Sequence, residues 1–180
     1  MPATKIMLIR HAEKPDGDVG LMPDGTQNPE ALTALGWRRA NALVGLFAPA
    51  NDAAPRPPLA RPVSLFASGS QSLRPMQTIA PLATALNLPV STFPKGQEAQ
   101  LVAAVKAPEG PALISWQHEA IPEIATLIRG RADGVPPTWP GHRFDLVWVF
   151  DLMGDGTWSF AQAPQLLMPG DSPKPIGLSG

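Results

Sequence analysis

Short apolar runs that alternate with segments of helical spacing constrain the fold of this 180-residue chain more than any other feature. Each run has the length and apolar character of a buried strand, and each following segment repeats apolar residues at the spacing of one helix face. The predicted strands cover residues 6–9, 63–67, 89–93 and 112–116, and the predicted helices cover residues 33–47, 73–86, 97–106 and 119–129. This order predicts an α/β fold, a three-layer sandwich with a mostly parallel central sheet and helices on both faces.

The last part of the sequence departs from this alternation. Two apolar segments, residues 144–150 and 157–160, flank a Gly-Asp-Gly triplet at residues 154–156. This pattern predicts a hairpin added at an edge of the sheet. From about residue 169 the chain is rich in Pro, Gly and Ser, so we expect residues 169–180 to form a frayed tail.

Composition indicates one globular domain over residues 1–180, because 44% of the residues are hydrophobic and 16% are charged. The prolines of residues 49–62 mark a connection within that domain, since both flanks belong to the same alternation. A net charge of −1 without a dense Lys/Arg run argues against a nucleic-acid partner, and the absence of cysteine excludes disulfides and thiolate catalysis. The N-terminus shows neither a signal peptide nor a spanning helix, so we expect no membrane partner and a cytoplasmic location.

Arg10 and His11 directly follow the first predicted strand. In open α/β sheets, ligands bind beyond the carboxyl ends of the strands. Arginine supplies a fixed cation and neutral histidine a nitrogen nucleophile, which are the groups that a phosphoryl transfer needs. A solvated loop start is the alternative reading of this pair alone.

Two distant residues strengthen the functional interpretation. Arg74 lies in the first turn of a predicted helix, where a cation opposes the positive end of the helix dipole unless an anion lies between them. His118 follows the predicted strand at residues 112–116. We therefore expect Arg10, His11, Arg74 and His118 to converge on one anion.

Four segments resemble, in order and spacing, the histidine phosphatase superfamily, which includes the cofactor-dependent phosphoglycerate mutases. The segments are Leu8-Ile9-Arg10-His11-Ala12-Glu13, residues 32–40, residues 72–78, and Ile114-Ser115-Trp116-Gln117-His118. The resemblance spans roughly residues 5 to 130, and the conjunction of these motifs is specific.

The resemblance implies a mechanism. His11 would attack phosphorus through an unprotonated ring nitrogen and form a phosphohistidine, while Arg10, Arg74 and His118 would hold the non-bridging oxygens. No metal or cofactor is implied, and the three histidines do not show metal-ligand spacing. Lys14 is a candidate for extending the positive rim over a substrate, although an exposed lysine without a role is the commoner case.

The general acid stays open between two glutamates. In the mutase-like branch of the superfamily the acid lies after the second arginine, where Glu98 matches, and in the acid-phosphatase branch it follows the second histidine, where Glu119 matches. Each also has a structural explanation, since Glu98 complements a helix N-terminus and Glu119 fits a solvated first turn. Glu13 is a third candidate, but it follows the nucleophile so closely that its reach to the leaving group is in question.

The segment between Arg74 and His118 is only long enough for the predicted helices and strands, so it leaves no room for a cap. An open pocket favours hydrolysis, because a mutase must shield its phosphohistidine from water. We therefore predict a metal-independent phosphatase acting on a phosphorylated small molecule or a phosphoprotein, including phosphohistidine. A phosphoglycerate mutase-type transferase is one alternative, and a catalytically idle phosphate-binding module is another.

Overall fold

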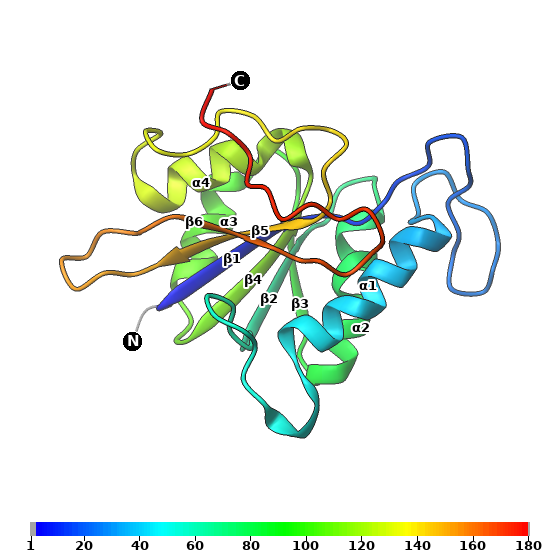
Figure 1. Ribbon diagram of the computed structural model, residues 1–180, viewed down its shortest axis with the longest axis horizontal. Coiled ribbons are helices and arrows are strands. Elements are labelled where there is room, and N and C mark those ends of the chain that lie inside the picture. Colours follow the sequence, from blue (N-terminus) through cyan, green and yellow to red (C-terminus); the bar gives the residue numbers. More distant parts are fainter. Residues whose placement is uncertain (1–2, 180) are drawn as a thin grey trace.

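A mixed six-stranded sheet forms the centre of the computed structural model, which describes residues 3–179 (Figure 1). Its strands are β1 (Lys5–Arg10), β2 (Ser64–Ser68), β3 (Val90–Phe93), β4 (Pro111–Trp116), β5 (Leu146–Asp151) and β6 (Ala161–Pro164). They lie in the order β3-β2-β4-β1-β5-β6. The β3–β2, β2–β4 and β4–β1 pairs are parallel, whereas β1–β5 and β5–β6 are antiparallel.

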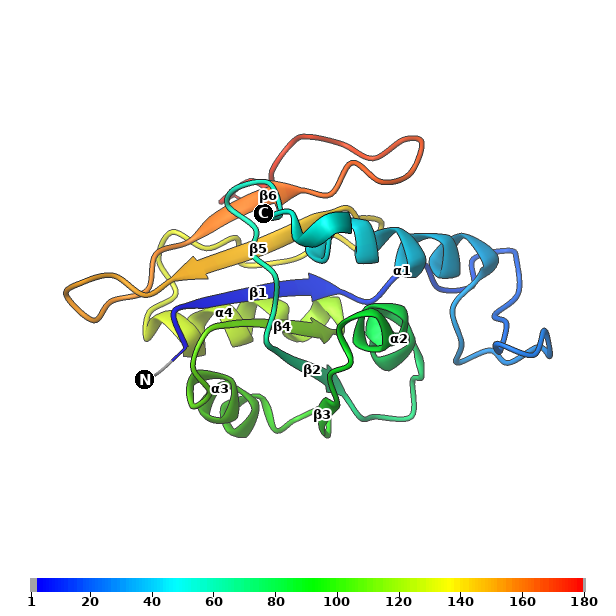
Figure 2. The same ribbon diagram turned by 90° about the horizontal axis from the view of Figure 1, so that it is seen from below.

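Four α-helices cover the two faces of this sheet, as the sequence predicts. They are α1 (Ala34–Phe47), α2 (Arg74–Leu86), α3 (Glu98–Lys106) and α4 (Ile121–Arg129). The pair α1 and α2 packs on one face and the pair α3 and α4 on the other (Figure 2), so the α/β three-layer prediction is confirmed. No helix in the described part of the chain is long and apolar enough to cross a membrane.

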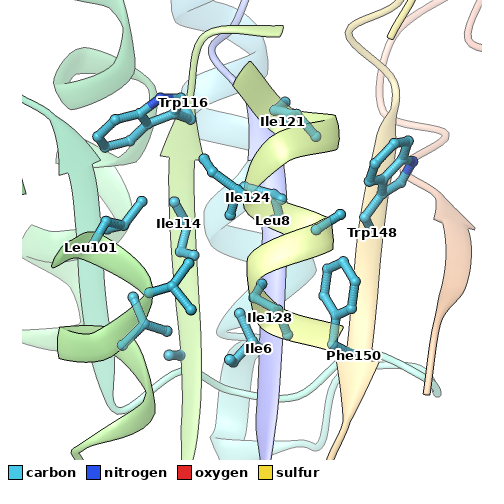
Figure 3. Close-up of a cluster of buried hydrophobic side chains, with 14 of the residues drawn as sticks. Ile6, Leu8, Leu101, Ile114, Trp116, Ile121, Ile124, Ile128, Trp148 and Phe150 are labelled. Atoms are coloured by element: carbon cyan, nitrogen blue, oxygen red, sulfur yellow. The ribbon is translucent and has the colours of Figure 1, made fainter. Parts of the chain in front are cut away.

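The alternation of β1 assigns its side chains to two cores. Ile6 and Leu8 face α3 and α4, where they meet Ile124 and other apolar residues of α4 (Figure 3). Met7 and Ile9 face the opposite way, into the core beneath α1 and α2. Because both faces of β1 are buried, the polar residues that follow the strand emerge at a rigid sheet edge.

The edge hairpin is confirmed, but its second strand begins later than expected. The stretch predicted at residues 157–160 contains only an isolated bridge between Leu152 and Trp158, and regular pairing with β5 starts at Ala161. A turn closed by the bond from Met153 N to Thr157 O uses residues 153–157, which moves the second strand toward the C-terminus.

The segment from residue 169 is held by hydrogen bonds, which differs from the expected frayed tail. Asp171 accepts bonds from the Arg39 guanidinium at 2.8 and 3.0 Å, and Ser172 N donates to Asp145 Oδ2 at 2.7 Å. Ile176 N donates to Gln162 Oε1 at 2.9 Å. Arg39 is buried, and a buried guanidinium requires carboxylate partners, which explains why a Pro- and Gly-rich segment is nevertheless ordered. Gly180 lies outside the described residues.

Candidate active site

The carboxyl ends of β1, β2 and β4 and the first turn of α2 surround a cavity of about 270 Å³. It is lined by Arg10, His11, Lys14, Ser70, Gln71, Ser72, Arg74, Lys95, Gln117, His118 and Glu119. The structure therefore brings together the four residues predicted to converge on an anion, and adds Lys14 from the predicted rim.

His11 is held as a neutral base. Its side chain is buried, and Nδ1 lies 2.7 Å from the carbonyl oxygen of Ala12. A carbonyl only accepts, so Nδ1 carries the proton and Nε2 carries the lone pair. Burial, followed by the positive charge of Arg10, lowers the pKa of His11 to about 3, so the ring stays unprotonated near neutral pH.

Arg10 presents unused donors beside this histidine. Its Nη1 donates to the carbonyl oxygens of Gly141 at 2.6 Å and Arg143 at 3.0 Å, and its guanidinium carbon lies 3.9 Å from the centre of the Phe144 ring. Its Nε and Nη2 are buried without a hydrogen-bond partner among residues 3–179. Burial lowers the pKa of Arg10 to about 10, which leaves it charged at neutral pH. Buried, charged donors without partners indicate a place for an anionic ligand.

Arg74, the first residue of α2, has the same character. Its Nη1 donates to Pro29 O at 3.0 Å, and its Nη2 lies 3.9 Å from a carboxylate oxygen of Glu30. Its buried Nε has no hydrogen-bond partner in the described part of the chain. Thr78 joins α2 to the segment that follows β1, because its hydroxyl donates to Arg74 O at 2.7 Å and accepts from Ala12 N at 2.8 Å.

His118 and Glu119 form the opposite wall. His118 Nδ1 lies 3.4 Å from Glu119 Oε2. Burial, together with the charge of Arg10, lowers the pKa of His118, so this ring is also neutral at pH 7. Burial raises the pKa of Glu119, but its own backbone N–H, His118 when that ring is protonated, and the charges of Lys95 and Arg10 outweigh that effect and lower it. Without a ligand, Glu119 is therefore a carboxylate.

No protein-family model and no curated protein matches this chain. Among solved structures, a mycobacterial glucosyl-3-phosphoglycerate phosphatase is similar at a TM-score of 0.54 and 13% identity, over 88% of this chain and 97% of that chain. The same phosphatase in a complex with inorganic phosphate matches at a TM-score of 0.52 and 12% identity, over 88% and 95%. A phosphoglycerate mutase from Plasmodium falciparum matches at a TM-score of 0.55 and 12% identity, over 98% and 99%.

The chain has the fold of the histidine phosphatase superfamily. The resemblance predicted from the sequence motifs is thereby confirmed at the level of the fold. Both phosphatases and mutases have this histidine phosphatase fold, so the fold does not by itself decide between hydrolysis and transfer.

The three candidate acids of this histidine phosphatase fold lie in different surroundings. Glu98 is only 5% exposed and does not line the cavity; its Oε1 accepts from Gly96 N at 3.1 Å and from Trp116 Nε1 at 3.3 Å. Glu13 Oε1 is bound to Arg39, 2.8 Å from Nη2 and 2.9 Å from Nε. Of these three candidates, only Glu119 lines the cavity.

Several lining residues were not singled out from the sequence. Ser70 follows β2, Lys95 follows β3 and Gln117 follows β4. Gln117 Nε2 donates to Ser70 Oγ at 2.7 Å and to Ser68 Oγ at 3.0 Å, which ties the ends of β2 and β4 together. Each lies just beyond a predicted parallel strand, so a survey of polar residues at every strand end would have found them.

Among residues 3–179, no three His, Asp or Glu side chains are grouped so that they could hold a metal ion.

Proposed function

We propose that this protein is a phosphatase that hydrolyses phosphomonoesters through a phosphohistidine at His11. The observation that carries the proposal is a neutral, buried His11 with Nδ1 fixed by Ala12. It lies in a cavity where donors of Arg10 and Arg74 are buried without hydrogen-bond partners among the described residues. A nucleophile and a preorganised cationic site are what phosphoryl transfer requires. The substrate is a phosphorylated small molecule or a phosphoprotein.

The first step joins His11 Nε2 to phosphorus while the bond from phosphorus to the ester oxygen breaks. Arg10 and Arg74 donate to the non-bridging oxygens, and each such contact contributes ~2 to 4 kcal/mol to stabilising the transition state. Neutral His118 donates a further hydrogen bond. In the second step water attacks phosphorus and gives a proton to the Glu119 carboxylate, which had protonated the ester oxygen in the first step. The bond from phosphorus to Nε2 breaks, and inorganic phosphate leaves.

Glu119 is the proton donor in this proposal. It lines the cavity, whereas Glu98 and Glu13 are occupied by Trp116 and Arg39. Its low pKa in the empty site must rise before it can donate a proton. A bound phosphate dianion produces that rise, because a nearby negative charge disfavours the carboxylate.

Access of water favours hydrolysis over transfer. Between Arg74 and His118 the chain forms only α2, β3, α3, β4 and their connections, so that stretch adds no cap over the cavity. The rim residues Lys14, Gln71 and Lys95 are exposed. A phosphohistidine in an open site is consumed by water before a second acceptor can be held there.

The test incubates the purified protein with a phosphomonoester in the presence of a chelator, and measures phosphate bound to the protein and phosphate released. A reaction quenched during turnover should yield an acid-labile, base-stable phosphate on the protein, and the released product should be inorganic phosphate. His11→Ala should abolish both, whereas His142→Ala, which alters a histidine outside this cavity, should retain them. Transfer between positions of one substrate would indicate a mutase instead. Tight phosphate binding without any turnover would indicate an idle binding module.

A further inference from the structure

The cavity has two layers of positive charge. Its floor consists of Arg10 and Arg74, whose unused donors are buried beside His11. Its mouth carries Lys14 and Lys95, both exposed. These lysines come from separate loops, Lys14 from the loop after β1 and Lys95 from the loop after β3. Two distant segments therefore place the same charge over one opening.

The lysines at the mouth are free to bind a ligand. Neither ammonium has a hydrogen bond or an ion pair with the described residues, in contrast to Lys106, which donates to Ile128 O at 2.8 Å. The chain has five lysines, and two of them line this cavity. Lys14 and Lys95 both act on His118, where their charges lower the pKa of the ring.

A phosphate group alone leaves the lysine pair unused. The two floor arginines carry as many positive charges as a phosphate dianion carries negative ones. Among the described residues that line the cavity, Glu119 is the single carboxylate, and its side chain is 59% exposed. Glu119, the proposed proton donor, must face the leaving oxygen, and the charge of Lys95 acts on its carboxylate. The leaving group therefore extends on the side of the cavity that carries a lysine.

We propose that the preferred substrate is a phosphomonoester whose leaving group carries a second anionic group, a carboxylate or a phosphate, which Lys14 and Lys95 bind at the mouth of the cavity. This proposal rests on the proposed phosphatase activity, and it adds the substrate class. An ammonium is a compact charge without the planar fork of arginine, so it can donate to a carboxylate or to a phosphate. The arms of the test separate those two groups.

The test uses propyl phosphate and derivatives that carry a carboxylate, a second phosphate or an ammonium at the far end of the chain. The anionic derivatives should exceed propyl phosphate in kcat/KM by about 10-fold, mainly through KM, because two exposed ion pairs contribute modestly each. The ammonium derivative should be the poorest. The preference should shrink at high salt.

The double variant Lys14→Gln/Lys95→Gln should bring the anionic derivatives and propyl phosphate to similar kcat/KM values. Lys174→Gln, at an exposed lysine outside the cavity, should keep the preference. Equal kcat/KM values in the unaltered protein, or a preference that survives the double variant, would overturn the proposal. A larger gain for only one of the two anions would identify which group is bound.

Calorimetry separates failure of this proposal from failure of the phosphatase proposal. His11→Ala protein cannot form the phosphohistidine, so affinities for the same esters can be measured without turnover. The order of affinities should again favour the anionic derivatives, and equal affinities would refute the second subsite. If that order holds but the unaltered protein hydrolyses none of the esters, the anion subsite stands and the phosphatase proposal falls.

Discussion

Single residues in the cavity are distinguished by which of their atoms have partners. The motifs predict Arg10, His11, Arg74 and His118, because each lies at a strand end or helix start that faces the same sheet edge. The same reasoning cannot separate Glu98 from Glu119, since both lie at helix starts. The bonds from Trp116 Nε1 and Gly96 N to Glu98 are tertiary, and they appear only when the chain is folded.

The proton donor can be identified with two classes of ester. Glu119→Gln should slow hydrolysis of alkyl phosphates by ~100-fold or more and nearly spare aryl phosphates, because only the alkyl leaving oxygen needs a proton. Glu98→Gln should affect both classes alike and slightly. Steady-state rates on propyl phosphate and an aryl phosphate provide the measurement. If Glu98→Gln alone shows the selective loss, the acid is Glu98.

At the scale of elements, the start of α1 supports the loop that follows His11. Thr33 caps α1 by accepting from Gly36 N at 3.1 Å, and Thr33 N donates to Glu13 O at 3.1 Å. Gly36 lets the helix approach closely, because a Cβ there would lie 2.6 Å from Glu13 O. The glycine therefore allows the helix and the loop to pack together.

Two glycines of α1 provide a matched comparison. Gly36→Ala should destabilise the protein by about 1 to 3 kcal/mol and lower kcat/KM, because the added methyl displaces the loop that carries Lys14. Gly45→Ala has open space around the new Cβ and should stabilise by about 0.5 to 1 kcal/mol. Urea unfolding of both variants gives the two values. A stabilised, fully active Gly36→Ala protein would contradict the close packing.

Most elements could be predicted because their signals are local. The periodicity of β1 to β4 and of the four helices depends on residues within each segment, and a 3₁₀ turn at His118–Ala120 merely delays α4 by two residues relative to the prediction. The second hairpin strand begins at Ala161 and not at residue 157, because the turn between the strands extends to Thr157 and only an isolated bridge follows it. The order of residues 169–179 depends on Arg39, which lies about 130 residues earlier, so no local pattern indicates it.

The molecule as a whole should lose stability in mild acid because of His11. Its pKa is about 3 in the folded protein, below its ordinary value of 6.5. Between these values the unfolded chain binds a proton that the folded chain does not, so stability decreases as pH falls. From pH 6.5 to pH 5 this amounts to about 1 to 2 kcal/mol. Urea unfolding at both pH values should show this loss, and His11→Gln should show correspondingly less.

If the unaltered protein and His11→Gln lost the same free energy of unfolding between pH 6.5 and pH 5, the burial of a neutral ring at residue 11 would be contradicted. His142→Gln is the control, because it alters an exposed histidine outside the cavity. His118 contributes in the same direction as His11, since its pKa is also lowered.

The central position of β1 determines when the floor of the cavity can form during synthesis of the chain. β1 is made first, yet it lies between β4 and β5, and Arg10 finds its carbonyl partners 131 and 133 residues later. A nascent chain that has left the ribosome only as far as β3 already contains His11 and Arg74, but β1 then has neither of its neighbouring strands. Arg10, His11 and Arg74 are therefore made early but positioned late, when β4 and β5 have paired with β1.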